Sequence, residues 1–120
     1  MARILVAEDN VLNFELVRDV LEGQGHEIEW ARDGEEALAK AGGSAFALLL
    51  LDLHMPKLDW LEVLAALRRA GASPARVVVV SADAMGGVPE AVAQAGADAY
   101  LSKPLEVGAL VAEVNRQLGR

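Results

Sequence analysis

Short apolar runs alternate along this chain with longer segments whose apolar residues recur at helical spacing. Five runs are typical of strands and span residues 4–7, 28–31, 46–51, 77–80 and 99–101. The first, third and fourth runs are apolar throughout, as expected for strands buried on both faces of a sheet. The second run is more polar, which indicates an edge strand. This alternation limits the chain to a small set of folds.

A segment typical of a helix follows each of the five runs. These segments span residues 11–22, 33–43, 58–70, 89–94 and 105–118, and glycines end several of them. Five successive strand–helix units predict an α/β fold, with a doubly wound parallel sheet, helices on both faces and right-handed crossovers. With the apolar strands central, we expect the flavodoxin-like strand order 2-1-3-4-5 and five helices, whereas a barrel would need about eight units.

Length, charge and cysteine content narrow the function classes. The chain has 120 residues and no linker or repeat, so we expect a single domain over residues 1–120. The net charge of -7 disfavours direct binding to nucleic acid or to an anionic membrane. Because cysteine is absent, a disulfide scaffold, a thiolate zinc site and a thiol nucleophile are excluded. The start of the chain does not resemble a signal peptide, and we expect a cytoplasmic protein.

Polar side chains stand at the carboxyl ends of four predicted strands, where open parallel sheets bind ligands. They are Glu8 and Asp9 after the first strand, Asp52 after the third, Ser81 after the fourth, and Lys103 after the fifth. Singly, each residue is explained by a turn, a helix cap, a loop or a solvated charge. Their joint position at one edge of the sheet favours a functional site.

The chemistry of these residue types indicates a metal and a phosphoryl group. Three carboxylates a few ångströms apart cannot all stay ionised without compensation, and a hard cation such as Mg²⁺ supplies it through oxygen ligands. Lys103 offers a positive charge and Ser81 a hydroxyl donor for the oxygens of a phosphoryl group. Asp52 would then be the nucleophile that becomes an aspartyl phosphate.

The motifs at the strand ends resemble those of the response regulator receiver domain family, the phosphoacceptor modules of two-component signalling. The resemblance covers residues 3–118, and its motifs are Ile4–Asn10, Leu51–Pro56, Ser81–Ala82 and Lys103–Pro104. It implies a magnesium set consisting of Glu8 (through a water), Asp9, Asp52 and the backbone carbonyl of His54. It also implies a phosphorylation and switch set consisting of the phosphoacceptor Asp52, the switch hydroxyl Ser81, the switch aromatic Tyr100 and the phosphate-pairing Lys103.

The resemblance further implies a role in a phosphorelay. A histidine kinase or a histidine phosphotransfer protein would pass a phosphoryl group to Asp52 with the help of Mg²⁺. The phosphorylated state would then change a protein-binding surface on the fourth helix, fifth strand and fifth helix. The chain would assist its own phosphorylation without being a conventional enzyme. Trp60 stands where the family usually has glycine, and either a partner contact or a buried packing position explains it.

Three alternatives to a phosphoacceptor receiver remain. A flavodoxin-type cofactor binder shares the strand order, but Glu8 and Asp9 would repel its phosphate in the absence of a metal. An aspartate-nucleophile phosphatase typically carries a second aspartate two residues after the nucleophile, where this chain has His54. A degenerate receiver that acts only as a protein-docking module is the strongest alternative. It predicts a broken acidic set, whereas the set in this chain is whole.

Overall fold

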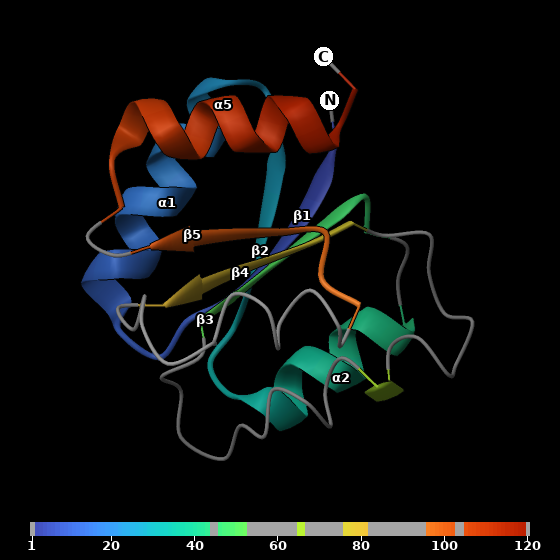
Figure 1. The fold of residues 1–120 in the computed structure, drawn as a ribbon. Coiled ribbons are helices and arrows are strands. Elements are labelled where there is room, and N and C mark those ends of the chain that lie inside the picture. Colours follow the sequence, from blue (N-terminus) through green and yellow to red (C-terminus); the bar gives the residue numbers. More distant parts are fainter. Residues whose placement is uncertain are drawn as a thin grey trace.

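A computed structural model of the chain describes residues 2–43, 46–52, 65–66, 76–81, 96–102 and 105–119. The strands in these ranges are β1 (Arg3–Ala7), β2 (Glu27–Ala31), β3 (Leu48–Asp52), β4 (Arg76–Ser81) and β5 (Ala99–Ser102). The helices labelled in Figure 1 are α1 (Val11–Gly23), α2 (Gly34–Gly43) and α5 (Val107–Gln117). Ala65 and Ala66 are also helical. The predicted helices at 58–70 and 89–94 otherwise lie outside the described residues.

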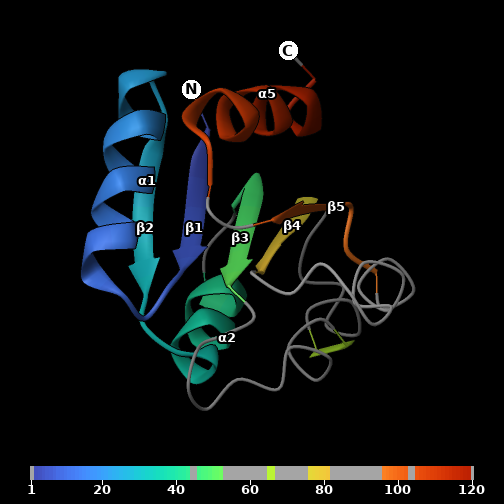
Figure 2. The ribbon, with the colours of Figure 1, turned by 60° about the vertical axis from the view of Figure 1, so that its left-hand side comes forward.

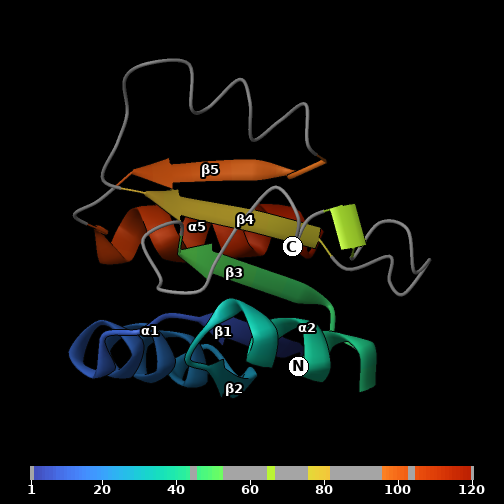
Figure 3. The ribbon, with the colours of Figure 1, turned by 90° about the horizontal axis from the view of Figure 1, so that it is seen from below.

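All neighbouring strands pair in parallel, and the sheet order is β2-β1-β3-β4-β5. Figure 2 shows this order from left to right, and Figure 3 shows it from below. The order confirms the α/β, doubly wound arrangement predicted from the sequence. Every residue of β3 is buried, whereas the edge strand β2 is exposed at Glu27 and half-buried over the next three residues. Arg3 on β1 lies 3.4 Å from Glu29 and adds a surface ion pair at this edge.

Two apolar cores lie on opposite faces of the sheet, because successive strand side chains point to alternate faces. One core joins α1 and α5 to the sheet and includes Val6, Leu50 and Val80. The other joins α2 to the sheet and includes Ala7, Leu51 and Val79. Figure 1 shows α1 and α5 together on one side of the sheet and α2 on the other side. This alternation determines the face toward which each residue at the strand ends points.

Both ends of the third strand differ from the predicted ends. Phe46 is only 5% exposed, yet it precedes the strand, whose pairing with β1 begins at Leu48 opposite Ile4. An apolar run indicates that its residues are buried, but a buried residue need not be hydrogen-bonded within the sheet. At the other end, Asp52 belongs to the strand and pairs with Val80 of β4. The backbone that carries this carboxylate is therefore held by the sheet itself.

Local hydrogen bonds fix the ends of the elements. The Asn10 side chain caps α1, because its Oδ1 accepts from the backbone N–H of Asn13 at 3.0 Å. Asp33 caps α2 in the same way, accepting from Glu36 N at 2.8 Å. Between α1 and β2, Gly25 has a φ of +92°, which a residue with a side chain rarely adopts.

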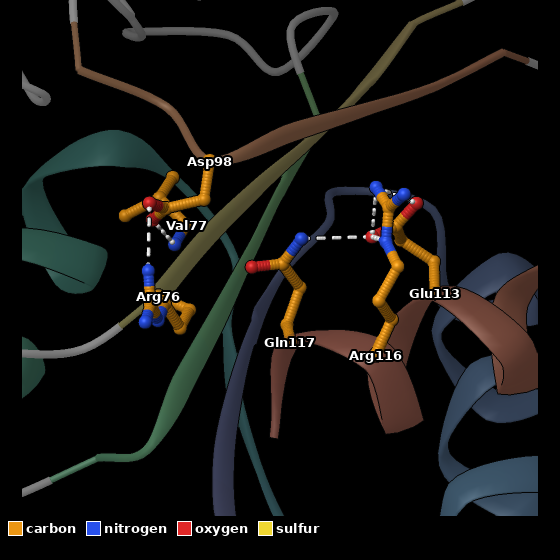
Figure 4. A network of polar contacts seen from close by, with 6 residues as sticks. All are labelled: Arg76, Val77, Asp98, Glu113, Arg116 and Gln117. Atoms are coloured by element: carbon orange, nitrogen blue, oxygen red, sulfur yellow. Dashed lines mark hydrogen bonds and ion pairs between the residues drawn. The ribbon is translucent and has the colours of Figure 1, made fainter. Parts of the chain in front are cut away.

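The start of β5 is fastened to β4 by Asp98, as Figure 4 shows. Its Oδ2 accepts from the backbone N–H of Val77 at 2.8 Å, and its own N–H donates to the carbonyl of Val77 at 2.8 Å. Arg76 lies 3.4 Å from the same carboxylate. A separate group on α5 joins Arg116 and Gln117 to Glu113.

Within the described ranges, every helix is too short or too polar to cross a membrane.

Candidate functional site

Three carboxylates meet at the carboxyl ends of β1 and β3. One oxygen each from Glu8, Asp9 and Asp52 lies within 4.8 Å of the others. The sheet register explains this meeting, because Ala7 pairs with Leu51 and the next residue of each strand is an acid. Figure 2 shows the ends of β1 and β3 side by side. The structure thus brings together the three acids that the sequence placed at the strand ends.

The three carboxylates differ in their exposure to solvent. Glu8 is 6% exposed and Asp52 is 4% exposed, whereas Asp9 is open to solvent. Burying two carboxylates close together is costly unless a positive charge or hydrogen bonds compensate. The donor set consists of oxygens alone, which matches the preference of a hard divalent cation such as Mg²⁺. The residues present therefore fit a magnesium ion, with Asp9 on the solvent side.

An apolar cavity borders the two buried carboxylates. Its wall is formed by Glu8, Asp52 and the following residues of the sheet and of the α1 and α5 side: Val6, Ala7, Val17, Leu50, Val80 and Leu105. Glu8 and Asp52 each stand two positions after a residue of the core shared with α1 and α5, so strand alternation directs them to this same face. Because apolar walls lower the local dielectric constant, charges interact more strongly here than in water.

The predicted switch residues lie on the two strands beyond β3. Ser81 is 1% exposed and ends β4, and Tyr100 is half-buried on β5. Tyr100 pairs with Val79 and packs against the core on the α2 side. Ser81 stands two positions after Val79, so it points toward this same face of the sheet. The structure thus places the hydroxyl and the aromatic ring on one face, as diagonal neighbours on adjacent strands.

Three other residues singled out in the sequence lie outside the described residues. They are His54, Lys103 and Trp60. The predicted backbone ligand, the predicted phosphate-pairing lysine and the predicted partner contact are therefore not placed by the structure.

Sequence reasoning missed Trp30, a half-buried residue of the edge strand β2. Its indole Nε1 donates to the backbone carbonyl of Glu8 at 2.7 Å. A tryptophan in an amphipathic strand usually indicates packing, and the residues are 22 positions apart in the chain. No sequence signal joins them, because the contact depends on the pairing of β1 with β2.

Comparison with known proteins decides the family. The family model described as "Response regulator receiver domain" matches residues 4–115. The chain belongs to the response regulator receiver domain family. A curated relative of this receiver, the polar-differentiation response regulator DivK of Brucella anthropi, is 36% identical over 117 residues. That alignment covers 97% of this chain and 95% of DivK.

Solved structures agree with this assignment. The receiver domain of the Francisella response regulator 1452 superposes with a TM-score of 0.92 at 28% identity, covering 100% of this receiver and 98% of that chain. A response regulator from Burkholderia pseudomallei has a TM-score of 0.83 at 30% identity, covering 93% of this receiver and 65% of that chain. The Burkholderia structure contains a phosphorylated aspartic acid, a calcium ion and citrate.

Family membership establishes the general role of the chain. It is a response regulator receiver of two-component signalling, homologous to DivK and to CheY-like proteins. Receivers of this kind are signalling proteins that bind Mg²⁺ at an acidic pocket and act with a phosphodonor and a downstream protein. In this chain, Glu8, Asp9 and Asp52 form an acidic cluster.

Proposed function

We propose that this receiver accepts a phosphoryl group on Asp52 from a histidine kinase or a histidine phosphotransfer protein. The observation that carries the proposal is the meeting of three carboxylate oxygens within 4.8 Å, with Asp52 at the centre of the sheet edge. In the transfer, a P–O bond forms to Asp52 as the P–N bond of the donor phosphohistidine breaks, and the imidazole keeps the bonding electrons. The related Burkholderia protein, with its phosphorylated aspartic acid and its calcium ion, supports this chemistry.

Glu8, Asp9, Asp52 and the His54 backbone carbonyl are the proposed protein contacts of Mg²⁺, with Glu8 acting through a water. Bound Mg²⁺ supplies positive charge for the phosphoryl oxygens and for the carboxylates that hold it. The apolar wall beside Glu8 and Asp52 keeps bulk water from one side of the site. Asp52 is 4% exposed, and this burial would restrict the rotation of its side chain before the attack.

Lys103 and Ser81 are the proposed contacts of the phosphoryl group, through an ammonium charge and a hydroxyl. Ser81 and Tyr100 share one face of the sheet, so a movement of the hydroxyl toward the phosphoryl group opens space into which the Tyr100 ring can turn. The downstream partner would bind the surface formed by the predicted fourth helix, β5 and α5. The change therefore biases an existing equilibrium between two arrangements of that surface.

The phosphodonor protein is the proposed occupant of the exposed apolar side of α1. This helix begins two residues after Asp9, and its exposed side chains include Val11, Leu12 and Leu16. Leu12 is 72% exposed and stands four residues before Leu16, so the two side chains lie on the same side of the helix and form an apolar surface of the kind that marks protein contacts. A donor helix seated there would hold its phosphohistidine next to the carboxylates. We further infer that residues 1–120 form one domain and that it works in the cytoplasm.

The test is to weigh the intact protein after incubation with Mg²⁺ and acetyl phosphate, a small phosphodonor. We expect a gain of one phosphoryl mass in the natural chain and none in the Asp52→Asn variant or in the presence of EDTA. Asp19→Asn, an exposed acid on α1, is the matched control and should be labelled like the natural chain. If the natural chain gains no mass where another receiver does, the docking-only alternative replaces this proposal.

The other two alternatives are distinguished by two separate assays. A phosphatase would turn over a phosphoester continuously, and a flavodoxin-type protein would show the absorbance of bound flavin after incubation with FMN. Either result would contradict the phosphoacceptor role.

A further inference from the structure

The edge strand β2 holds the peptide groups before and after Glu8. The N–H of Glu8 donates to the carbonyl of Ala31 at 3.0 Å. The carbonyl of Glu8 accepts from the indole N–H of Trp30 at 2.7 Å. These two bonds fix the peptide before Glu8 and the peptide between Glu8 and Asp9. Both carboxylates of this segment therefore leave a backbone whose orientation β2 sets.

The indole of Trp30 is itself held in place. Its ring stacks on Phe14 of α1 with centroids 4.5 Å apart and planes 8° from parallel. The guanidinium of Arg32 lies 4.6 Å from the centre of the same ring. Lys40 of α2 donates to the backbone carbonyl of Trp30. This packing orients the indole N–H toward the Glu8 carbonyl before any ligand binds. Residues that do not touch a metal commonly act in this way, by orienting the groups that bind it.

We propose that Trp30 is a positioning residue for the metal site, acting through its hydrogen bond to the Glu8 carbonyl. The inference rests on the proposed magnesium site. Without the indole donor, the Glu8–Asp9 peptide can rotate, and cation binding must then order two of the three carboxylates. Among the aromatic side chains, phenylalanine keeps a six-membered ring for stacking and has no N–H, so it removes the donor.

The test measures Mg²⁺ affinity by isothermal titration calorimetry on the folded, unphosphorylated protein. We expect Trp30→Phe to weaken Mg²⁺ binding about threefold to tenfold, the effect of losing one oriented outer hydrogen bond. Arg3→Lys is the matched control, because it keeps the charge and removes the planar group from over Phe46, which belongs to the core on the face of the sheet opposite Trp30. Its Mg²⁺ dissociation constant should stay within about twofold of the natural value. A merely structural role for Trp30 would lower the free energy of unfolding in EDTA and leave the Mg²⁺ affinity unchanged.

If Trp30→Phe does not fold, 3-benzothienylalanine at position 30 gives the same comparison, since sulfur replaces the N–H in a ring of nearly the same shape. An unchanged dissociation constant in the folded variant overturns the positioning role while the magnesium site stands. Undetectable Mg²⁺ binding by the natural chain overturns the magnesium site and this inference together.

Discussion

Replacing Asp52 with asparagine should stabilise the fold in the absence of divalent cations. The substitution keeps the size and shape of a buried side chain and removes one negative charge from a cluster of three. In the natural chain, folding brings these charges together, and their repulsion is a cost that the unfolded chain does not bear. The variant avoids much of this cost.

The distances in the cluster give the size of the effect. At an effective dielectric constant of about 20, two unit charges 4.8 Å apart repel by about 3.5 kcal/mol. Solvent screens the exposed Asp9, and the proposed Lys103 would offset part of the repulsion of Asp52. We therefore expect the free energy of unfolding to rise by about 1–3 kcal/mol in Asp52→Asn.

Urea unfolding at neutral pH, followed by circular dichroism, measures this difference in EDTA and in Mg²⁺. Mg²⁺ should stabilise the natural chain, by about 1.4 kcal/mol at a concentration ten times its dissociation constant. The variant lacks one ligand and should gain less, so the difference between the two proteins narrows in Mg²⁺.

The matched control for this experiment is Asp19→Asn. Asp19 is an exposed acid that lies 3.2 Å from Arg18 and takes no part in the cluster. Its replacement should change the free energy of unfolding by about 0.5 kcal/mol or less. If Asp52→Asn is no more stable than the natural chain in EDTA, the three carboxylates do not repel one another as the geometry requires, and the electrostatic reasoning is wrong.

Two further substitutions test the surroundings of the site. Asn10→Ala removes the cap of α1, so the free energy of unfolding should fall by about 1 kcal/mol in urea unfolding; an unchanged value would show that the 3.0 Å bond to Asn13 contributes nothing. Leu12→Ser should slow phosphotransfer from a partner histidine kinase about fivefold to tenfold, because an apolar contact is lost, and leave labelling by acetyl phosphate unchanged. Equal losses with both donors would contradict docking on α1.

The pattern of apolar runs predicted the architecture well, for a physical reason. Strands buried on both faces must be apolar throughout, and this property identified β1, β3 and β4 as central. Parallel pairing then sends all carboxyl ends to one edge, so Glu8 and Asp52 had to meet. The boundaries were less accurate, because Phe46 is buried without belonging to the strand and Asp52 belongs to the strand although it is charged.

The sequence by itself determined the strand order, the acids at the sheet edge and the resemblance to receivers, because these follow from residue type and spacing along the chain. The tertiary structure decided which oxygens lie within reach of one cation, which carboxylates are buried, and that Ser81 and Tyr100 share a face. It also decided the bond from Trp30 to Glu8. That contact joins side chain to backbone across two strands, and its geometry exists only once the sheet has formed.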